Sequence, residues 1–169
     1  GTFLVALPTL LTGFTVTASL ETAGRLRGGK GLFGWIGRLP WSEPVALGGI
    51  LAVFTLLPGG FGGLINASYN MNLVVHNTAW ISGHFHLTVG TAVTLLFFGM
   101  AYWLAPRLFQ VKLHSRRLVE VHFWIATVGI LLYIVAQYVA GLTEGLMWRA
   151  LDESGHLKYP DFIESVVAV

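Results

Sequence analysis

The chain has 169 residues, of which 54% are hydrophobic and only 11% are charged, and its mean hydropathy is +0.70. This composition is typical of a membrane protein. It excludes a disordered chain and, because there is no cysteine, a disulfide scaffold or a cysteine-ligated zinc domain. The net charge is only +2 and the basic residues are divided among separate segments, so we expect no nucleic-acid partner.

Four stretches are long and apolar enough to span a bilayer, because its hydrocarbon core is about 30 Å thick and a spanning helix needs about 20 residues. In each stretch the apolar residues occupy every side of the helix, as expected for contact with lipid or with other helices. The predicted fold class is therefore an all-α, polytopic transmembrane helix bundle. The predicted spans are Thr2–Ala23, Val45–Ile65, Ala79–Leu104 and Leu118–Val139.

The connections between the spans differ in charge, which predicts the direction of each span. Of the ten Lys and Arg residues, four lie in the connection 24–44 and four in the connection 105–117, whereas the connection 66–77 has no charged residue. Because basic loops stay in the cytoplasm, we expect the first and third connections there. The segment 140–165 is then an extracytoplasmic loop, and residues 1–169 form a single transmembrane unit.

Two histidines, His84 and His86, lie inside the third predicted span. They follow the expected N-cap, Thr78, by six and eight residues, so they lie about 9 and 12 Å below the outer boundary. An ionisable side chain at that depth is costly without a partner. Because residues two apart on a helix point about 200° from each other, the two imidazoles leave opposite faces and cannot bind the same metal ion.

Two imidazoles that point to separate sites inside a membrane indicate two cofactors, one on each side of the helix. Haem iron is the acceptor most often held by a single histidine from a given helix. A helix diameter near 10 Å and metal–imidazole bonds of about 2 Å would place the two irons roughly 14 Å apart. The alternative interpretations are a proton relay in a transporter, or histidines that only form hydrogen bonds with neighbouring helices.

The run from His76 to His86, HNTAWISGHFH, resembles the tenth-helix signature of the catalytic subunit of haem-copper oxidases, and most of all the pattern of their B family. The first connection, from Glu21 to Trp35, is similar to that of the same family. Three later segments resemble the C family instead: Pro106–Phe109, His122–Thr127 and Gly145–Ala150. The resemblance therefore covers nearly the whole chain, although two branches of the superfamily share it.

The resemblance implies roles for five residues. His84 matches the proximal, catalytic ligand of the high-spin haem iron, and His86 matches an axial ligand of the low-spin haem iron. His76 and Asn77 match positions near the high-spin haem propionates, where the A family has Asp in place of Asn77. Arg149 matches an arginine that pairs with a propionate, a role suited to its forked guanidinium.

The resemblance also implies a larger protein. We expect the chain to be the C-terminal third of a catalytic subunit I with about twelve spans, inactive alone, with copper B ligated by helices outside this chain. The implied partners are the other part of subunit I, subunit II or a cytochrome c electron donor, membrane lipid, and oxygen as substrate. The implied location is the inner membrane of a prokaryotic cell.

The predicted function is part of a terminal respiratory oxidase that reduces oxygen to water, coupled to proton uptake or pumping. The alternative within the superfamily is nitric oxide reductase, and the alternative from another class is a proton-coupled membrane transporter. A row of hydroxyls on the first span either bonds to carbonyls one turn earlier, which we favour, or forms a cytoplasmic proton path. These hydroxyls belong to Thr9, Thr12, Thr15 and Ser19.

Overall fold

The computed structural model describes residues 2–161, within which the chain forms four long helical rods. Three of them are the uninterrupted helices α1 (Thr2–Leu26), α2 (Pro44–Ala67) and α6 (Arg116–Met147). The other rod has three consecutive parts, namely α4 (Ala79–Phe85), the π-helical segment η2 (His86–Val93) and α5 (Thr94–Leu108). Two short helices lie in the connections, the 3-10 helix η1 (Ile36–Arg38) and α3 (Tyr69–Val75).

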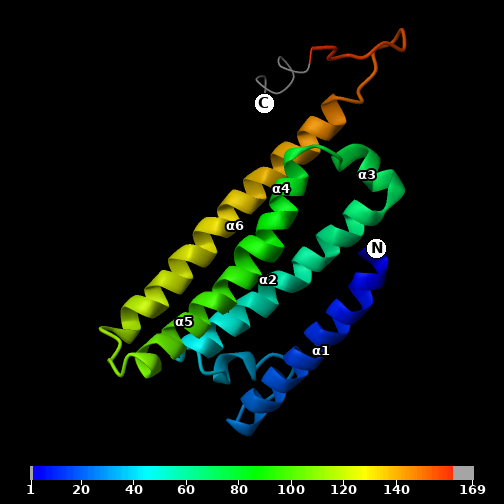
Figure 1. Cartoon of the computed structure of the whole chain (residues 1–169). Helices are drawn as coiled ribbons and strands as arrows, with labels where there is room; N and C mark the ends of the chain where they lie inside the picture. The colour runs from blue at the N-terminus through cyan, green and yellow to red at the C-terminus, as the bar shows by residue number, and fades with distance from the viewer. Residues whose placement is uncertain (1, 162–169) are drawn as a thin grey trace.

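The rods pack side by side with α2 at the centre. Figure 1 shows α2 between α1 and the α4–η2–α5 rod, and α6 along the other side of that rod. Two glycines bring α2 and α5 close together: a Cβ on Gly48 would lie 2.6 Å from the Leu95 carbonyl oxygen, and one on Gly99 would lie 3.1 Å from the Pro44 carbonyl oxygen. Small residues allow membrane helices this close approach. The buried side chains beside the contact are Leu47, Leu51, Leu95, Val119 and Phe123.

The start of each inner helix follows from its local sequence. Pro44 occupies the first turn of α2, where its missing N–H leaves no hydrogen bond unmade. Thr78 caps α4 by accepting a hydrogen bond from the Trp80 N–H, and Ser115 caps α6 in the same way through the Leu118 N–H. Before Thr78, Asn77 adopts a φ of 61°, a left-handed conformation that asparagine tolerates better than most residues. This residue makes the sharp turn between α3 and α4.

All four rods are long and apolar enough to cross a membrane, and each of the four predicted spans falls within one of them. The predicted fold class is confirmed: the chain is an all-α, polytopic membrane protein. Figure 1 also shows the connection that precedes α2 and the connection that precedes α6 at the same end of the bundle, opposite the C-terminal tail. An ion pair of 3.2 Å between Arg116 and Glu43 joins the two basic connections at that end.

The structure differs from the sequence prediction at two places. α6 continues to Met147, so the first eight residues of the predicted loop 140–165 are helical, because Gly141 and Gly145 pack against the backbone of the preceding connection and α4. The rest of that loop begins with a turn closed by a bridge between Leu151 and Leu157, and residues 162–165 lie outside the described residues. The third span is not a uniform α-helix, because η2 interrupts it directly at His86.

Candidate functional site

The start of α4 is attached to both α2 and α6. A side-chain oxygen of Glu144 on α6 accepts a hydrogen bond of 2.8 Å from the Ala79 N–H, one of the backbone groups that a helix start leaves unpaired. The Trp80 indole donates to the Asn66 side-chain oxygen on α2 at 3.0 Å, and its ring lies 4.3 Å from the Tyr138 ring on α6. These contacts hold the first turn of α4, four to seven residues before the two histidines.

Glycines on α6 allow this attachment. A Cβ on Gly141 would lie 2.6 Å from the Trp80 Cα and closer still to the Trp80 backbone nitrogen, so only glycine fits the contact. One helical turn later, a Cβ on Gly145 would lie 2.9 Å from the Val74 carbonyl carbon. Over this turn, α6 therefore approaches the backbone of α4 through Gly141 and that of α3 through Gly145.

His84 lies against the glycine-rich part of α2. A Cβ on Gly62 would lie 3.0 Å from His84 Nδ1, and this buried nitrogen has no hydrogen bond of regular geometry, although the backbone of Gly59 lies close enough to interact with the ring. The ring lines a cavity of about 230 Å³ between α1 and α2, together with Thr88 and Gly60. A Cβ on Gly60 would meet no atom of residues 2–161 within 4 Å, so this wall of the cavity is open.

His86 has different neighbours. Its Nδ1 lies 2.8 Å from the Ser82 carbonyl oxygen, one turn earlier, and its ring meets Tyr133 of α6 edge-on at 4.9 Å. Gly90 lies one turn later, where a Cβ would approach His86 Cδ2 to 3.4 Å. The two imidazoles thus occupy separate surroundings, in agreement with the opposite faces predicted from their spacing.

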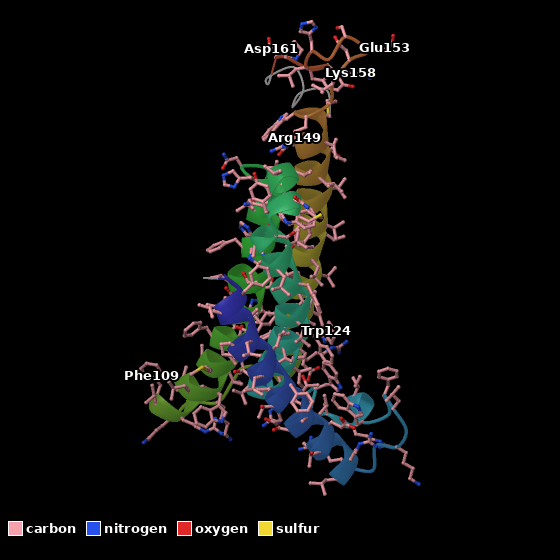
Figure 2. The ribbon with its side chains drawn as sticks, turned by 90° about the vertical axis from the view of Figure 1, so that its right-hand side faces the viewer. Phe109, Trp124, Arg149, Glu153, Lys158 and Asp161 are labelled. Atoms are coloured by element: carbon pink, nitrogen blue, oxygen red, sulfur yellow. The ribbon has the colours of Figure 1, made fainter. Side chains whose placement is uncertain are left out.

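The three other candidate residues lie near the start of α4. His76 is exposed at the end of α3, and Asn77 forms the left-handed turn after it. Arg149 follows the end of α6, and its Nη1 donates to the Val74 and Gly145 carbonyl oxygens at 3.2 and 3.0 Å. Figure 2 shows Arg149 at the same end of the molecule as Glu153, Lys158 and Asp161 of the tail.

Three of the four hydroxyls singled out on the first span bond to carbonyls one turn earlier, which is the interpretation favoured from the sequence. Thr9, Thr15 and Ser19 each donate to the carbonyl oxygen four residues earlier, at 2.8 Å. Thr9 nevertheless lines the cavity beside His84. Because their protons are already donated, these hydroxyls are left with acceptor capacity only.

Sequence analysis missed several of the groups that hold the histidines. Ser82 is four residues before His86, a spacing that predicts a contact on a helix, so this partner was available from the sequence. Glu144 was assigned to the predicted loop 140–165, and its hydrogen bond to α4 joins residues 65 positions apart. No local pattern indicates such a contact.

The whole chain, residues 1–169, matches the family model described as cytochrome c and quinol oxidase polypeptide I. The chain belongs to this family. It is 49% identical over 143 residues to cytochrome c oxidase subunit 1 of Thermus thermophilus, covering 83% of this chain and 25% of that protein. It is 39% identical over 109 residues to the cbb3-type cytochrome c oxidase subunit CcoN1 of Stutzerimonas stutzeri, covering 64% of this chain and 23% of that protein.

The fold is also similar to that of a solved oxidase. A chain in the cryo-EM structure of a heme-copper terminal oxidase dimer superposes with a TM-score of 0.75 at 31% identity, covering 98% of this chain and 31% of that one. This haem-copper oxidase segment therefore spans about a quarter to a third of the length of these three relatives.

Proposed function

We propose that this chain forms the haem-holding helices of a terminal respiratory oxidase, with His84 as proximal ligand of a high-spin haem and His86 as axial ligand of a low-spin haem. The observation that carries the proposal is the pair of imidazoles on one membrane-spanning rod, each with its own surroundings. A single histidine from a given helix is a common protein ligand of haem iron.

The surroundings of His84 fit a flat, bulky group. The ring lines the cavity between α1 and α2, and the glycines on the α2 side keep side-chain bulk away from it. The neighbouring hydroxyl of Thr88 donates to the His84 carbonyl oxygen at 3.1 Å, so it does not compete for the ring. The buried Nδ1 lies on the side of Gly62, which leaves Nε2 as the nitrogen suited to an iron ligand.

The surroundings of His86 also fit a ligand of haem iron. The contact of 2.8 Å with the Ser82 carbonyl oxygen requires a proton on Nδ1, which leaves the lone pair of Nε2 free to bind a metal. In most metal-binding histidines, the ring nitrogen that does not bind the metal donates such a hydrogen bond, which orients the ring and makes it more basic. Tyr133 restricts the ring from the side of α6.

At the outer end, we assign Arg149 to the propionate carboxylates. Its Nη1 is held by two backbone carbonyls, which leaves its Nε and Nη2 groups to donate charge-assisted hydrogen bonds. We assign His76 to the same end: it is exposed directly after α3, two residues beyond Val74, whose carbonyl oxygen accepts from Arg149. Asn77 contributes by turning the chain so that α4 starts at this level.

When bound, the two haems supply redox-active iron, one for electron transfer and one for oxygen reduction to water. The residues of this chain hold, orient and bury them, and copper B is ligated by helices outside the chain. We further propose that electrons come from subunit II or a cytochrome c, that protons enter from the cytoplasmic side, and that the subunit lies in the inner membrane of a prokaryotic cell.

The roles of the histidines are tested in the full-length subunit with its partner subunits. His86→Gly removes the low-spin bands of the reduced-minus-oxidised spectrum while the haem that binds carbon monoxide persists, and His84→Gly does the reverse. Added imidazole restores the missing band in each variant, which separates loss of a ligand from misfolding. His114→Gly, in an exposed loop, is the control and keeps both signals. Retention of both haems in either of the first two variants would refute the assignment.

A further inference from the structure

A charged groove lies at the end of the bundle opposite Arg149. It has a volume of about 540 Å³ and lies between the start of α2, the end of α5 and the start of α6. Figure 2 shows Phe109, which follows α5, far from Arg149 along the molecule. The groove is separate from the cavity beside His84, and neither histidine lines it.

The side chains that line the groove favour an anion. Among the described residues that line it, Arg107, Lys112 and Arg116 are the cations and Glu43 is the only carboxylate. Glu43 forms its ion pair with Arg116, at 3.2 Å. Within residues 2–161, neither Arg107 nor Lys112 has a carboxylate at ion-pair distance, so their two charges remain uncompensated.

Arg107 is already oriented. Its guanidinium carbon lies 4.2 Å from the centre of the Trp103 ring, and its Nη1 donates to the Trp103 carbonyl oxygen at 2.6 Å. A guanidinium held over an indole and by a backbone carbonyl loses little freedom when it binds an anion, and its remaining N–H groups match the two oxygens of a phosphate. Only Lys112, on the connection after α5, must be ordered on binding.

The position of the groove indicates a lipid. Trp103 lines it, and Trp41 and Trp124 stack at 6.1 Å nearby at the same end of the bundle, as expected where helices leave the hydrocarbon. From the groove, α5 runs into the membrane with an exposed apolar face that contains Phe97, Met100 and Leu104. A ligand with a phosphate in the groove could therefore lay acyl chains along α5.

We propose that this groove binds the phosphate-bearing headgroup of an anionic phospholipid. Basic pockets between transmembrane helices on the cytoplasmic side bind such headgroups, and the groove lies between the two connections that contain eight of the ten basic residues. Each cation near an anionic headgroup contributes roughly fivefold to the affinity. Removal of two cations therefore weakens binding about 25-fold.

The test uses the full-length subunit, freed of lipid in detergent and titrated with phosphatidylglycerol while native mass spectrometry counts the bound lipids. The wild type retains one phosphatidylglycerol more tightly than phosphatidylcholine. The double variant Arg107→Gln with Lys112→Gln loses this preference about 25-fold, and Lys112→Gln alone, in an exposed connection, loses roughly fivefold. The matched control, Arg27→Gln with Lys30→Gln, removes equal charge from the other basic connection and leaves binding unchanged.

Two results would overturn the proposal. Equal retention of phosphatidylglycerol by the wild type and the double variant would show that the groove holds no lipid, as when another segment of the subunit fills it. Displacement of phosphatidylglycerol by inorganic phosphate at the same concentration would show that the groove binds free phosphate rather than a lipid. Neither result depends on the haem ligands, so this test is independent of the function proposed above.

Discussion

Replacing Gly141 by alanine tests whether the backbone contact between α6 and α4 holds the histidine rod in place. The new Cβ would lie 2.6 Å from the Trp80 Cα, which is 0.8 Å short of the 3.4 Å of ordinary van der Waals contact. The nearest neighbours are the backbone nitrogen, Cα and Cβ of Trp80, none of which moves away by rotation of a side chain. The helices must separate by at least that 0.8 Å.

The expected size follows from two opposing terms. Alanine in place of glycine stabilises a helix by about 0.5–1 kcal/mol, whereas overpacking of a close contact costs about 1–3 kcal/mol. Gly129 provides the matched control on the same helix, because a Cβ there meets no atom within 4 Å among the described residues. Gly129→Ala is therefore neutral or stabilising, and the difference between the two variants, about 1–3 kcal/mol, isolates the clash.

Thermal unfolding of the full-length subunit, followed by circular dichroism, measures this difference. Gly141→Ala lowers the Tm relative to Gly129→Ala, and because Trp80 lies one turn before His84, it also weakens the haem bands. An equal Tm and equal haem content in both variants would refute the reasoning that this contact positions the rod.

Two further predictions concern single hydrogen bonds near the outer end. Glu144→Leu leaves the Ala79 N–H without its acceptor and destabilises the subunit by about 1–3 kcal/mol in thermal unfolding. Glu144→Gln keeps an acceptor oxygen and destabilises the subunit less. Equal destabilisation by the two variants would contradict this role. The Ser154 hydroxyl and the His156 N–H donate to the Asp152 carboxylate and lower its pKa. These bonds therefore stabilise the turn fully above the usual pKa of an aspartate, and this stabilisation is lost as the pH falls through the lowered pKa. Hydrogen-exchange protection of residues 150–158, corrected for intrinsic rates, therefore holds from neutral pH down to about 4 and declines below it, and the variant Asp152→Asn lacks this dependence; protection already lost near pH 6 would exclude the explanation.

Hydropathy predicted the four rods well because each span must satisfy its backbone inside lipid, and an uninterrupted apolar helix is the simplest way to do so. The same criterion ended α6 too early. Glu144 interrupts the apolar stretch, but its carboxylate has a backbone partner on α4 and therefore does not end the helix. The residues that decide this are far apart in sequence, so a local pattern could not predict it.

The candidate site was predictable to a similar extent. The spacing of His84 and His86 was sufficient to place them on separate faces, and the structure gives them different neighbours. The partner that fixes the proton of His86, Ser82, follows from helical spacing, whereas Tyr133 depends on how α6 packs. The groove was not predicted as a site: the sequence grouped its three cations in the basic connection 105–117, but not the start of α2 that completes the groove.

The π-helical segment η2 begins at the second of the two histidines, His86, and rotates the part of the rod that follows relative to α4. The hydroxyls of Thr91 in η2 and of Thr94, which begins α5, donate to carbonyls five residues earlier, which supports the wider turns. A shift of one residue along a helix turns the side chains that follow by about 100° around the helix axis. α4 can therefore face Glu144 of α6 while α5 presents Gly99 to Gly48 of α2, although both helices belong to a single rod.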